Sequence, residues 1–379
     1  MDFNLDPKHQ MIKEVCRKFA DNEVETIAAE IDETERFPLE TIEKMGKLGL
    51  MGISIPKEYG GAGAGYTGFA IAIEEISKSC ATTSVILVAH TSLCASMIYN
   101  SGNKEQKQKY LVPLAKGEKL GAFGLTEPNA GSDASNQQTT AVLNGDHYLL
   151  NGSKIFITNG AHADTYVITA MTDTSKGLRG ISAFIIEKGW EGFSFGPPEN
   201  KMGIRGSSTT ELIFQDIKVP KENLIGKEGQ GFKMAMMTLD AGRIVVAAQA
   251  LGIAEAALEE SIKYVKERIQ FKKPLSKQQI IQFMIADMAT EVENGRNLVY
   301  KSAWLKDNGK SFGISSSMAK LYCSEMASRV TNKAIQLHGG YGYIKDYKVE
   351  RLMRDARITE IYEGTSEIQR TVISSSILK

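Results

Sequence analysis

The chain has 379 residues, with 45 basic and 45 acidic side chains and a formal net charge of zero. Its hydrophobic content of 42% supplies apolar material for two or three cores, so one small domain is not expected. Without a basic field to attract phosphate backbones or anionic lipid, the chain is expected to bind neither nucleic acid nor a membrane surface. No run approaches the roughly 20 apolar residues that span a bilayer, and the acidic start does not resemble a signal peptide, so we expect a cytoplasmic protein.

Cysteine and histidine spacing gives no sign of a metal site. The four cysteines lie far apart without a CxxC pair, and the five histidines form no HxxxH or Cys/His cluster. The cysteines fall in segments with helical periodicity, so we interpret them as buried thiols.

Residues 1–120 carry apolar stripes at helical spacing and are predicted to form an N-terminal helical domain. The expected helices are 7–29, 39–48, 68–79, 85–101 and 104–114. Asn103, followed closely by Gln106, is typical of a capped helix start. Residues 63–68 match GxGxxG, but no strand is expected before them and no acid follows at the required distance. We interpret that segment as a loop between helices.

Residues 121–230 change character and are predicted to form a β-domain. Short β-branched runs separated by Gly, Asn and Asp predict strands at 139–143, 148–158, 165–172, 181–187 and 210–219. The segment Asn144-Gly145-Asp146 is a hairpin signal between two of them. No helix intervenes to make a parallel crossover, so an antiparallel barrel or sandwich is expected.

Residues 231–379 contain a single proline, Pro274, and are predicted to form a C-terminal four-helix bundle. The expected helices are 232–268, 281–299, 314–337 and 359–378, the third ending at Gly339-Gly340. The first of these is apolar on most faces, so it is expected to form the centre of the bundle. The predicted fold class is therefore α+β and mainly α.

Two segments at the start and middle of the β-domain carry polar groups that suit a cofactor. In residues 125–133, Leu-Thr-Glu-Pro-Asn-Ala-Gly-Ser-Asp, hydroxyls and turn N–H groups can bond a polar ring edge or an anionic oxygen. In residues 156–160, Phe-Ile-Thr-Asn-Gly, an aromatic face and a hydroxyl end a strand. Both segments also fit plain turns, and from their spacing alone that alternative stays open.

A third candidate lies near the C-terminus, where Glu363 stands between Tyr362 and Gly364. An aromatic and largely apolar neighbourhood desolvates a carboxylate, so its pKa rises toward the range of a general base. Gly364 permits another molecule, such as a thioester, to approach closely. The alternative is that Glu363 is an acid at a helix N-terminus, with Thr365 to Glu367 forming a capping box.

Taken in this order, the three segments resemble the acyl-CoA dehydrogenase family of flavoproteins, most closely its bacterial short-chain, butyryl-CoA-type members. The resemblance runs over nearly the whole chain. Its further markers are Arg268 with Gln270-Phe271, Gln-Leu-His-Gly-Gly-Tyr-Gly at 336–342, and Arg351 with Arg354-Asp355. It implies the same order of helical domain, β-domain and bundle, with FAD between the last two.

The resemblance also implies roles for individual residues. Glu363 matches the catalytic base, and the position where some relatives place the base is Gly242 here. The residues implied to bind substrate are Ser132, Asp240, Arg243, Tyr362 and Gly364. The residues implied to bind FAD are Phe123, Leu125, Thr126, Gly131, Ser132, Phe156, Ile157, Thr158, Arg268, Phe271, Gln279, Gln336, Leu337, Gly339, Gly340, Thr365, Ser366 and Glu367.

The implied reaction is α,β-dehydrogenation of a short-chain acyl-CoA, from butyryl-CoA to crotonyl-CoA, or the reverse reduction. Electrons are exchanged with electron-transferring flavoprotein. A flavin oxidase and a non-catalytic nucleic-acid-binding member of the fold are the alternatives. The cofactor contacts from Arg268, Phe271, Gln279 and 336–340 come from a neighbouring subunit, which implies a homotetramer built as a dimer of dimers. The chain departs from its relatives at Lys272, where they have glycine, and at Gln278, where many have an aromatic residue or histidine.

Overall fold

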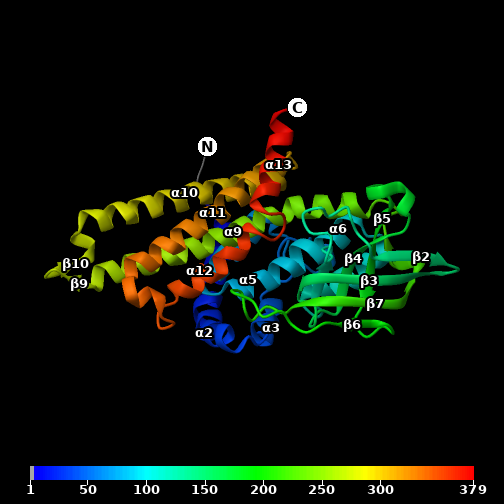
Figure 1. Cartoon of the computed structure of the whole chain (residues 1–379), viewed down its shortest axis with the longest axis horizontal. Coiled ribbons are helices and arrows are strands. Elements are labelled where there is room, and N and C mark those ends of the chain that lie inside the picture. The colour runs from blue at the N-terminus through cyan, green and yellow to red at the C-terminus, as the bar shows by residue number, and fades with distance from the viewer. Residues whose placement is uncertain (1–3) are drawn as a thin grey trace.

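The computed structural model describes residues 4–379 and places helices, a sheet and a helical bundle in chain order (Figure 1). Helical segments fill most of the chain as far as residue 116. They are α1 (Pro7–Phe19), η1 (Ala20–Val24), α2 (Glu25–Thr34), α3 (Leu39–Lys47), η2 (Lys57–Tyr59), α4 (Gly65–Ser79), α5 (Ala81–Leu87), η3 (Val88–Ala95), α6 (Ser96–Ser101), α7 (Lys104–Gln106), η4 (Lys107–Leu111) and α8 (Val112–Lys116). The helices expected in this region are therefore present.

Of two local predictions about helix starts, one is confirmed and the other holds only in part. Asn103 and Gln106 form a reciprocal capping box at α7, each side chain accepting the other's backbone N–H. Only Gly63 and Ala64 of the GxGxxG segment lie in a loop, and the segment from Gly65 to Gly68 forms the first turn of α4, so the predicted loop is shorter than expected and no strand precedes it. The Asp307 carboxylate accepts hydrogen bonds from the N–H groups of Tyr66 and Thr67 at 2.6 and 2.8 Å, so this helix start is already capped from within the chain.

The middle of the chain forms one eight-stranded sheet with the order β6-β7-β3-β2-β4-β5-β8 and β1 paired to β4. Its strands are β1 (Gly121–Gly124), β2 (Thr140–Asn144), β3 (His147–Thr158), β4 (Thr165–Met171), β5 (Ile181–Glu187), β6 (Phe193–Phe195), β7 (Thr209–Pro220) and β8 (Leu224–Ile225). The predicted hairpin joins β2 to β3, with Asn144 opposite His147. The sheet is mainly antiparallel, but β1 runs parallel to β4, and β2 meets β4 in parallel at one residue pair.

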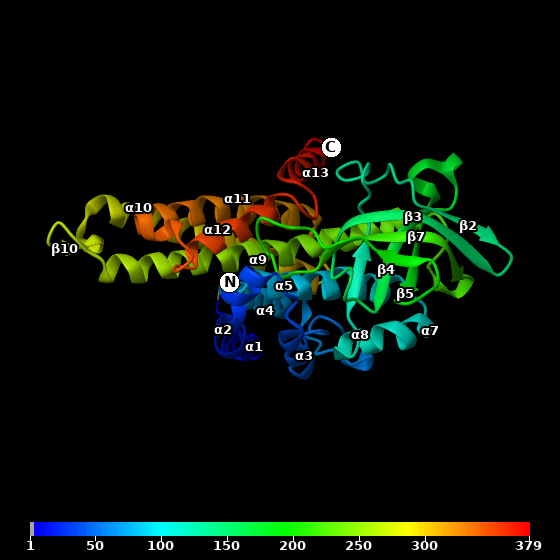
Figure 2. The same ribbon diagram turned by 60° about the horizontal axis from the view of Figure 1, so that its bottom comes forward.

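The C-terminal part is a helical bundle around a long central helix. Its elements are α9 (Gly231–Glu267), β9 (Ile269–Gln270), β10 (Lys273–Pro274), η7 (Leu275–Lys277), α10 (Gln279–Asp307), α11 (Gly313–His338), η8 (Gly339–Tyr343), α12 (Val349–Arg357), η9 (Ile358–Glu360) and α13 (Ser366–Ile377). Helix α9 packs against α10, α11 and α12 and also against α4. Figure 2 shows the N-terminal helices on one side of α9 and the remaining bundle helices on the other. The expected central position of this helix is confirmed.

The prediction of one helix over 359–378 is wrong. Over this range the chain instead ends η9 at Glu360, makes a turn over 361–365 and begins α13 only at Ser366, and the preceding helix α12 was not predicted. Glu363 and Gly364 both have positive φ, 51° and 95°, and two left-handed residues cannot continue a right-handed helix. Thr365 then caps α13 by accepting a hydrogen bond from the Ile368 N–H.

Two helical stretches, Ala81–Ser101 and Gly231–Glu267, are long and apolar enough to cross a membrane by length and composition, contrary to the expectation that none would be. However, 100% and 94% of their apolar windows are buried inside the protein. Helices in the core of a protein show such burial, because neighbouring elements cover their apolar surface. The four cysteines are buried as predicted.

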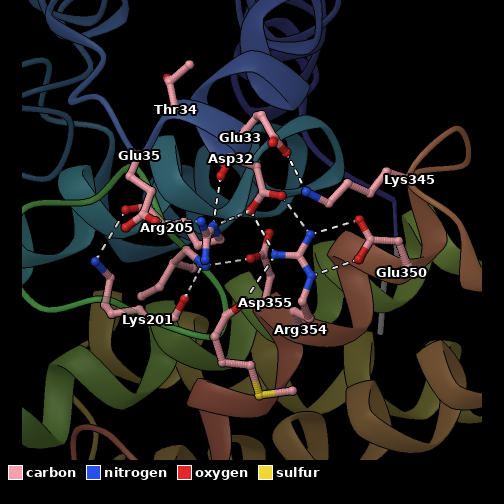
Figure 3. A network of polar contacts seen from close by, with 12 residues as sticks. Asp32, Glu33, Thr34, Glu35, Lys201, Arg205, Lys345, Glu350, Arg354 and Asp355 are labelled. Carbon is pink, nitrogen blue, oxygen red and sulfur yellow. Dashed lines mark hydrogen bonds and ion pairs between the residues drawn. The ribbon is translucent and has the colours of Figure 1, made fainter.

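A polar network joins the three parts of the chain (Figure 3). Arg354 on α12 binds the Asp32 carboxylate on α2 through two hydrogen bonds of 2.6 and 2.9 Å. Asp355 accepts the backbone N–H of Ile204 at 2.6 Å, and Arg205 donates to the Asp32 carbonyl at 2.8 Å. The segment between β6 and β7 is thereby fixed to helices from both ends of the sequence. The domain boundaries predicted at 120/121 and 230/231 stay predictions; they fall between α8 and β1 and between β8 and α9.

Candidate active site

A cavity of about 200 Å³ lies where the sheet, η3, α9 and the turn before α13 meet. All three parts of the chain contribute to its walls. The residues predicted from the sequence that line it are Phe123, Leu125, Thr126, Gly131, Ser132, Phe156, Ile157, Thr158, Arg243, Tyr362, Glu363 and Gly364. The three sequence segments singled out above therefore meet at one place, although more than 200 positions separate the first from the last in the printed sequence.

Glu363 stands on the strained turn between α12 and α13, with its φ of 51°. The residue as a whole is half-buried because it borders the cavity, but its Oε2 atom is shielded from solvent and has no hydrogen-bond partner. A Cβ added to Gly242 on α9 would lie 2.2 Å from this atom. Gly242 and the Glu363 carboxylate are therefore direct neighbours, and only glycine at position 242 leaves room for the carboxylate.

Burial raises the pKa of Glu363 to about 7, and the positive charges of Lys320 and Arg243 oppose that rise. Arg243 on α9 is itself bound to the Asp240 carboxylate at 2.6 Å and to the Ser317 hydroxyl at 3.1 Å, while its Nε atom has no partner. Desolvation raises the pKa of Asp240. A carboxyl group that titrates near neutral pH, next to an unused guanidinium N–H, has the properties of a general base beside an anion-binding group.

Hydrogen bonds hold the turn that carries Glu363. Gln369, one turn into α13, donates through Nε2 to the carbonyls of Glu363 and Gly364 at 3.3 and 2.9 Å. The Tyr362 hydroxyl donates to the Gln249 side chain on α9. These contacts fix the backbone on both sides of the carboxylate, so its position does not depend on the unfavourable φ values alone.

The loop after β1 carries Thr126, Gly131 and Ser132 to the cavity and is held from behind by a buried ion pair. Lys154 is completely buried and donates to Glu127 Oε1 at 2.7 Å and to the Leu125 carbonyl at 3.2 Å. Glu127 also accepts the backbone N–H groups of Gln138 and Thr139 at 2.5 and 3.1 Å. One carboxylate thus ties the start of the loop to its end.

Phe156 reaches the cavity through a bulge in β3. The register passes from Lys154 opposite Leu212 to Ile157 opposite Thr210, so two residues of β3 stand against one of β7. Phe156 takes a φ of 60°, and 59% of its surface is exposed. The bulge aims an aromatic face into the cavity and leaves Thr158 beside it.

A second groove of about 480 Å³ lies near the β9–β10 end of the bundle. Of the predicted residues it contains Arg268, Gln336, Leu337, Gly339 and Gly340. Figure 1 shows that this hairpin and the sheet are at opposite ends of the molecule. The remaining predicted residues lie outside both spaces: Asp240 beside Arg243, Phe271 in the hairpin turn, Gln279 at the start of α10, and Thr365, Ser366 and Glu367 at the start of α13.

Sequence reasoning missed part of the cavity wall. Apolar side chains from α5, η3 and α9 also line the cavity, and their pattern in the sequence is that of ordinary buried helix positions. They include Val85, Val88, Ala89, Leu93, Met236 and Leu239. The η3 segment is π-helical, a departure from α-helical geometry that often marks functional sites but leaves no clear signal in the sequence.

Three family models match the chain: the N-terminal domain of acyl-CoA dehydrogenase over residues 6–118, its middle domain over 122–217 and its C-terminal domain over 229–378. The chain belongs to the acyl-CoA dehydrogenase family. A short-chain specific acyl-CoA dehydrogenase of Clostridium acetobutylicum is 62% identical over 379 residues, covering 100% of both chains.

Two solved structures of acyl-CoA dehydrogenase fold also superpose on the whole chain. Butyryl-CoA dehydrogenase from Megasphaera elsdenii is 51% identical with a TM-score of 0.99, and the match covers 100% of both chains. A chain solved in work on the electron transferring flavoprotein of Acidaminococcus fermentans and flavin-based electron bifurcation is 56% identical, again with a TM-score of 0.99 and 100% coverage of both. The predicted family, fold class and oxidoreductase class of this acyl-CoA dehydrogenase are confirmed.

Proposed function

We propose that this acyl-CoA dehydrogenase family member oxidises a short-chain acyl-CoA such as butyryl-CoA to its trans-2-enoyl-CoA, with FAD as cofactor and Glu363 as the catalytic base. The observation that carries the proposal is the Glu363 carboxylate itself. Its Oε2 atom is shielded from bulk water and has no partner, and it lies on the wall of a cavity that is also lined by an aromatic ring and two threonines.

The cavity fits a planar ring system and an acyl thioester. Phe156 offers an exposed aromatic face, and Thr126 and Thr158 offer hydroxyls at its edge. A side chain at Gly131 would meet no atom within 4 Å, so the adjoining loop leaves open space. Two buried polar atoms at the site, Oε2 of Glu363 and Nε of Arg243, lack partners within the chain. Such orphaned groups are what a bound substrate would satisfy.

In this proposal the base acts on the weakly acidic hydrogen α to the thioester carbonyl. The α C–H bond breaks as its proton moves to the Glu363 carboxylate, and the β hydrogen leaves with its electron pair. FAD, when bound, supplies the two-electron acceptor for that hydride. The Glu363 backbone N–H holds the thioester carbonyl, where negative charge develops as the proton leaves. Tyr362, Gly364 and Arg243 position the rest of the substrate, and the same carboxyl group returns the proton when the reaction runs as a reduction.

The adenine end of FAD is proposed to bind a neighbouring copy of the chain. The two groups of predicted cofactor residues line two separate spaces, one against the sheet and one at the β9–β10 end of the bundle, and the sheet and this hairpin lie at opposite ends of the molecule (Figure 1), which favours two chains sharing one cofactor. Arg268 and the 336–340 turn therefore serve the partner's cavity in a homotetramer. We further propose butyryl-CoA as the preferred substrate, which the similarity to two short-chain relatives supports. We also propose electron-transferring flavoprotein as the electron partner, supported by the similarity to the chain from Acidaminococcus fermentans, and a cytoplasmic location.

The proposal is tested by anaerobic titration of the purified, yellow protein with acyl-CoAs of graded length. Butyryl-CoA is expected to bleach the flavin, and Glu363→Gln is expected to bind FAD but to lose bleaching. Glu118→Gln, which alters a carboxylate that is 60% exposed, is the control and keeps the native response. Bleaching at the native rate in Glu363→Gln would contradict the assignment of the base, and faster bleaching by octanoyl-CoA would contradict the chain length. A protein that stays colourless with added FAD would contradict the cofactor.

A further inference from the structure

A buried lysine on α11 has no acidic partner. Lys320 is completely buried, and its Nζ donates a hydrogen bond of 2.8 Å to the carbonyl of Gly364. Within residues 4–379, none of the ion pairs includes Lys320. A buried ammonium that is bonded only to a neutral carbonyl costs stability, so its presence beside the Glu363 turn calls for a reason other than folding.

The second cation near Glu363 and the acid in η9 are already engaged in ion pairs. Arg243, the second cation near the carboxylate, is neutralised by Asp240 at 2.6 Å. Glu360 accepts from Arg357 at 2.7 Å. The titratable groups on the elements packed against Glu363 are Arg243 and Asp240 on α9, Lys320 on α11, Tyr66 on α4, Tyr362 in the turn, Glu360 in η9 and Glu367 on α13. Lys320 is the one cation of this set without a carboxylate partner.

Helix α11 places both cations that act on Glu363. Ser317 and Lys320 are three positions apart, so their side chains share one face of the helix. Ser317 accepts from Arg243 at 3.1 Å, and Lys320 donates to Gly364 at 2.8 Å. Glu363 and Gly364 occupy the left-handed region, and the Lys320 bond adds a contact to α11 beside those that Gln369 and Tyr362 make to the same turn.

We propose that Lys320 is a positioning residue for proton abstraction: its buried ammonium holds the Glu363–Gly364 turn against α11 and supplies the uncompensated positive charge that keeps the Glu363 carboxylate ionised. This inference rests on the proposed role of Glu363 as the base. The electrostatics agree with the geometry. Burial raises the pKa of Glu363 to about 7. Two positive charges oppose this rise, and that of Lys320 opposes it more than that of Arg243. Burial lowers the pKa of Lys320 to about 8; the charge of Glu363 opposes this most, with smaller contributions from Glu360 and Glu367, while Arg243 adds to the lowering.

The test compares three variants of the flavin-loaded protein. Lys320→Met removes both charge and donor, Lys320→Gln removes the charge but keeps a donor, and Lys320→Arg keeps both. The first readout is the rate of flavin reduction by butyryl-CoA in a stopped-flow instrument across pH. The second needs no turnover: difference infrared spectroscopy against Glu363→Gln follows protonation of this one carboxyl group.

In Lys320→Met and Lys320→Gln, we expect two pH midpoints to rise by about one unit: that of the flavin reduction rate and that of Glu363 protonation. One unit is the smaller end of the effect of a close opposite charge. Near pH 7 the rate then falls about fivefold, because the ionised fraction drops from about one half to about one tenth. At high pH the rate of the Gln variant returns to within about twofold of the native rate. Lys320→Arg is expected to keep the native midpoint.

An unchanged midpoint in the Met and Gln variants, or a rate lowered equally at every pH, would overturn the inference and leave Lys320 a packing residue. If Lys320→Met does not fold, the Gln and Arg pair decides the question alone. Failure of the proposed function gives a different result, since Glu363→Gln would then still reduce flavin.

Discussion

Breaking the buried ion pair behind the cavity loop is expected to be among the most destabilising single changes in the β-domain. Glu127→Gln removes a carboxylate that is 4% exposed and leaves the ammonium of Lys154, which is 0% exposed, without a counter-charge. It also weakens the acceptors for the N–H groups of Gln138 and Thr139. Removing one partner of a buried pair costs about 3–5 kcal/mol, so the free energy of unfolding should fall by that amount.

The assay is urea unfolding followed by the fluorescence of Trp190, which packs in the sheet region, in a Trp304→Phe background. Lys154→Met and the double variant complete a cycle. Because the double variant strands no charge, its cost should be smaller than the sum of the single costs by about 2 kcal/mol. Lys345→Met breaks a pair whose side chains are 70% and 64% exposed, and it should leave the midpoint unchanged. A Glu127→Gln cost below about 1 kcal/mol, or additive single costs, would refute the reasoning.

Three further predictions concern other parts of the chain. Lys272→Gly should raise the free energy of unfolding by about 1 kcal/mol in urea, because Phe271 and Lys272 both occupy the left-handed region at φ 51° and 62°; a loss would contradict this. Gly242→Ala should slow flavin reduction by butyryl-CoA about 100-fold while FAD stays bound, because the added Cβ would displace the Glu363 carboxylate; a native rate would contradict it. Burial raises the pKa of Asp355 to about 6 from its usual 3.8, so the folded state holds this proton more tightly and stability falls as pH rises from about 4 to 6. Asp355→Asn should remove up to about 3 kcal/mol of that pH dependence, as measured by unfolding at both pH values, and an unchanged slope would refute it.

The sequence predicted the long elements because their periodicity extends over many turns. The central helix, the hairpin at Asn144 to Asp146 and the end of α11 at Gly339 all follow from local chemistry that the fold leaves intact. The error at 359–378 has a local cause too. Thr365 and the apolar spacing after it are helical signals, whereas the left-handed values at Glu363 and Gly364 are imposed by contacts from α9, α11 and α13. Strands of two to four residues, such as β1, β6 and β8, are too short to show alternation.

The candidate site was predictable where its residues carry distinctive chemistry. The segments around Thr126, Phe156 and Glu363 meet in one cavity, as the resemblance implied, while their roles there stay predictions. Val88 and Leu239 line the same cavity and were missed, because an apolar side chain facing a cavity has the same sequence pattern as one facing the core. Lys320 was missed for the opposite reason: a lysine in a helix normally indicates a solvated face.

The network of Asp32, Arg205, Arg354 and Asp355 bears on how such proteins can be recombined. Each of the three regions supplies a hydrogen-bond donor or acceptor whose partner lies in another region. A chimera that imports only a foreign β-domain would strand the Asp355 carboxylate, unless the incoming segment also presents a backbone N–H where Ile204 stands. A chimera is therefore expected to keep this network only if the contacting residues of all three regions are exchanged together, although the three regions are consecutive in the sequence.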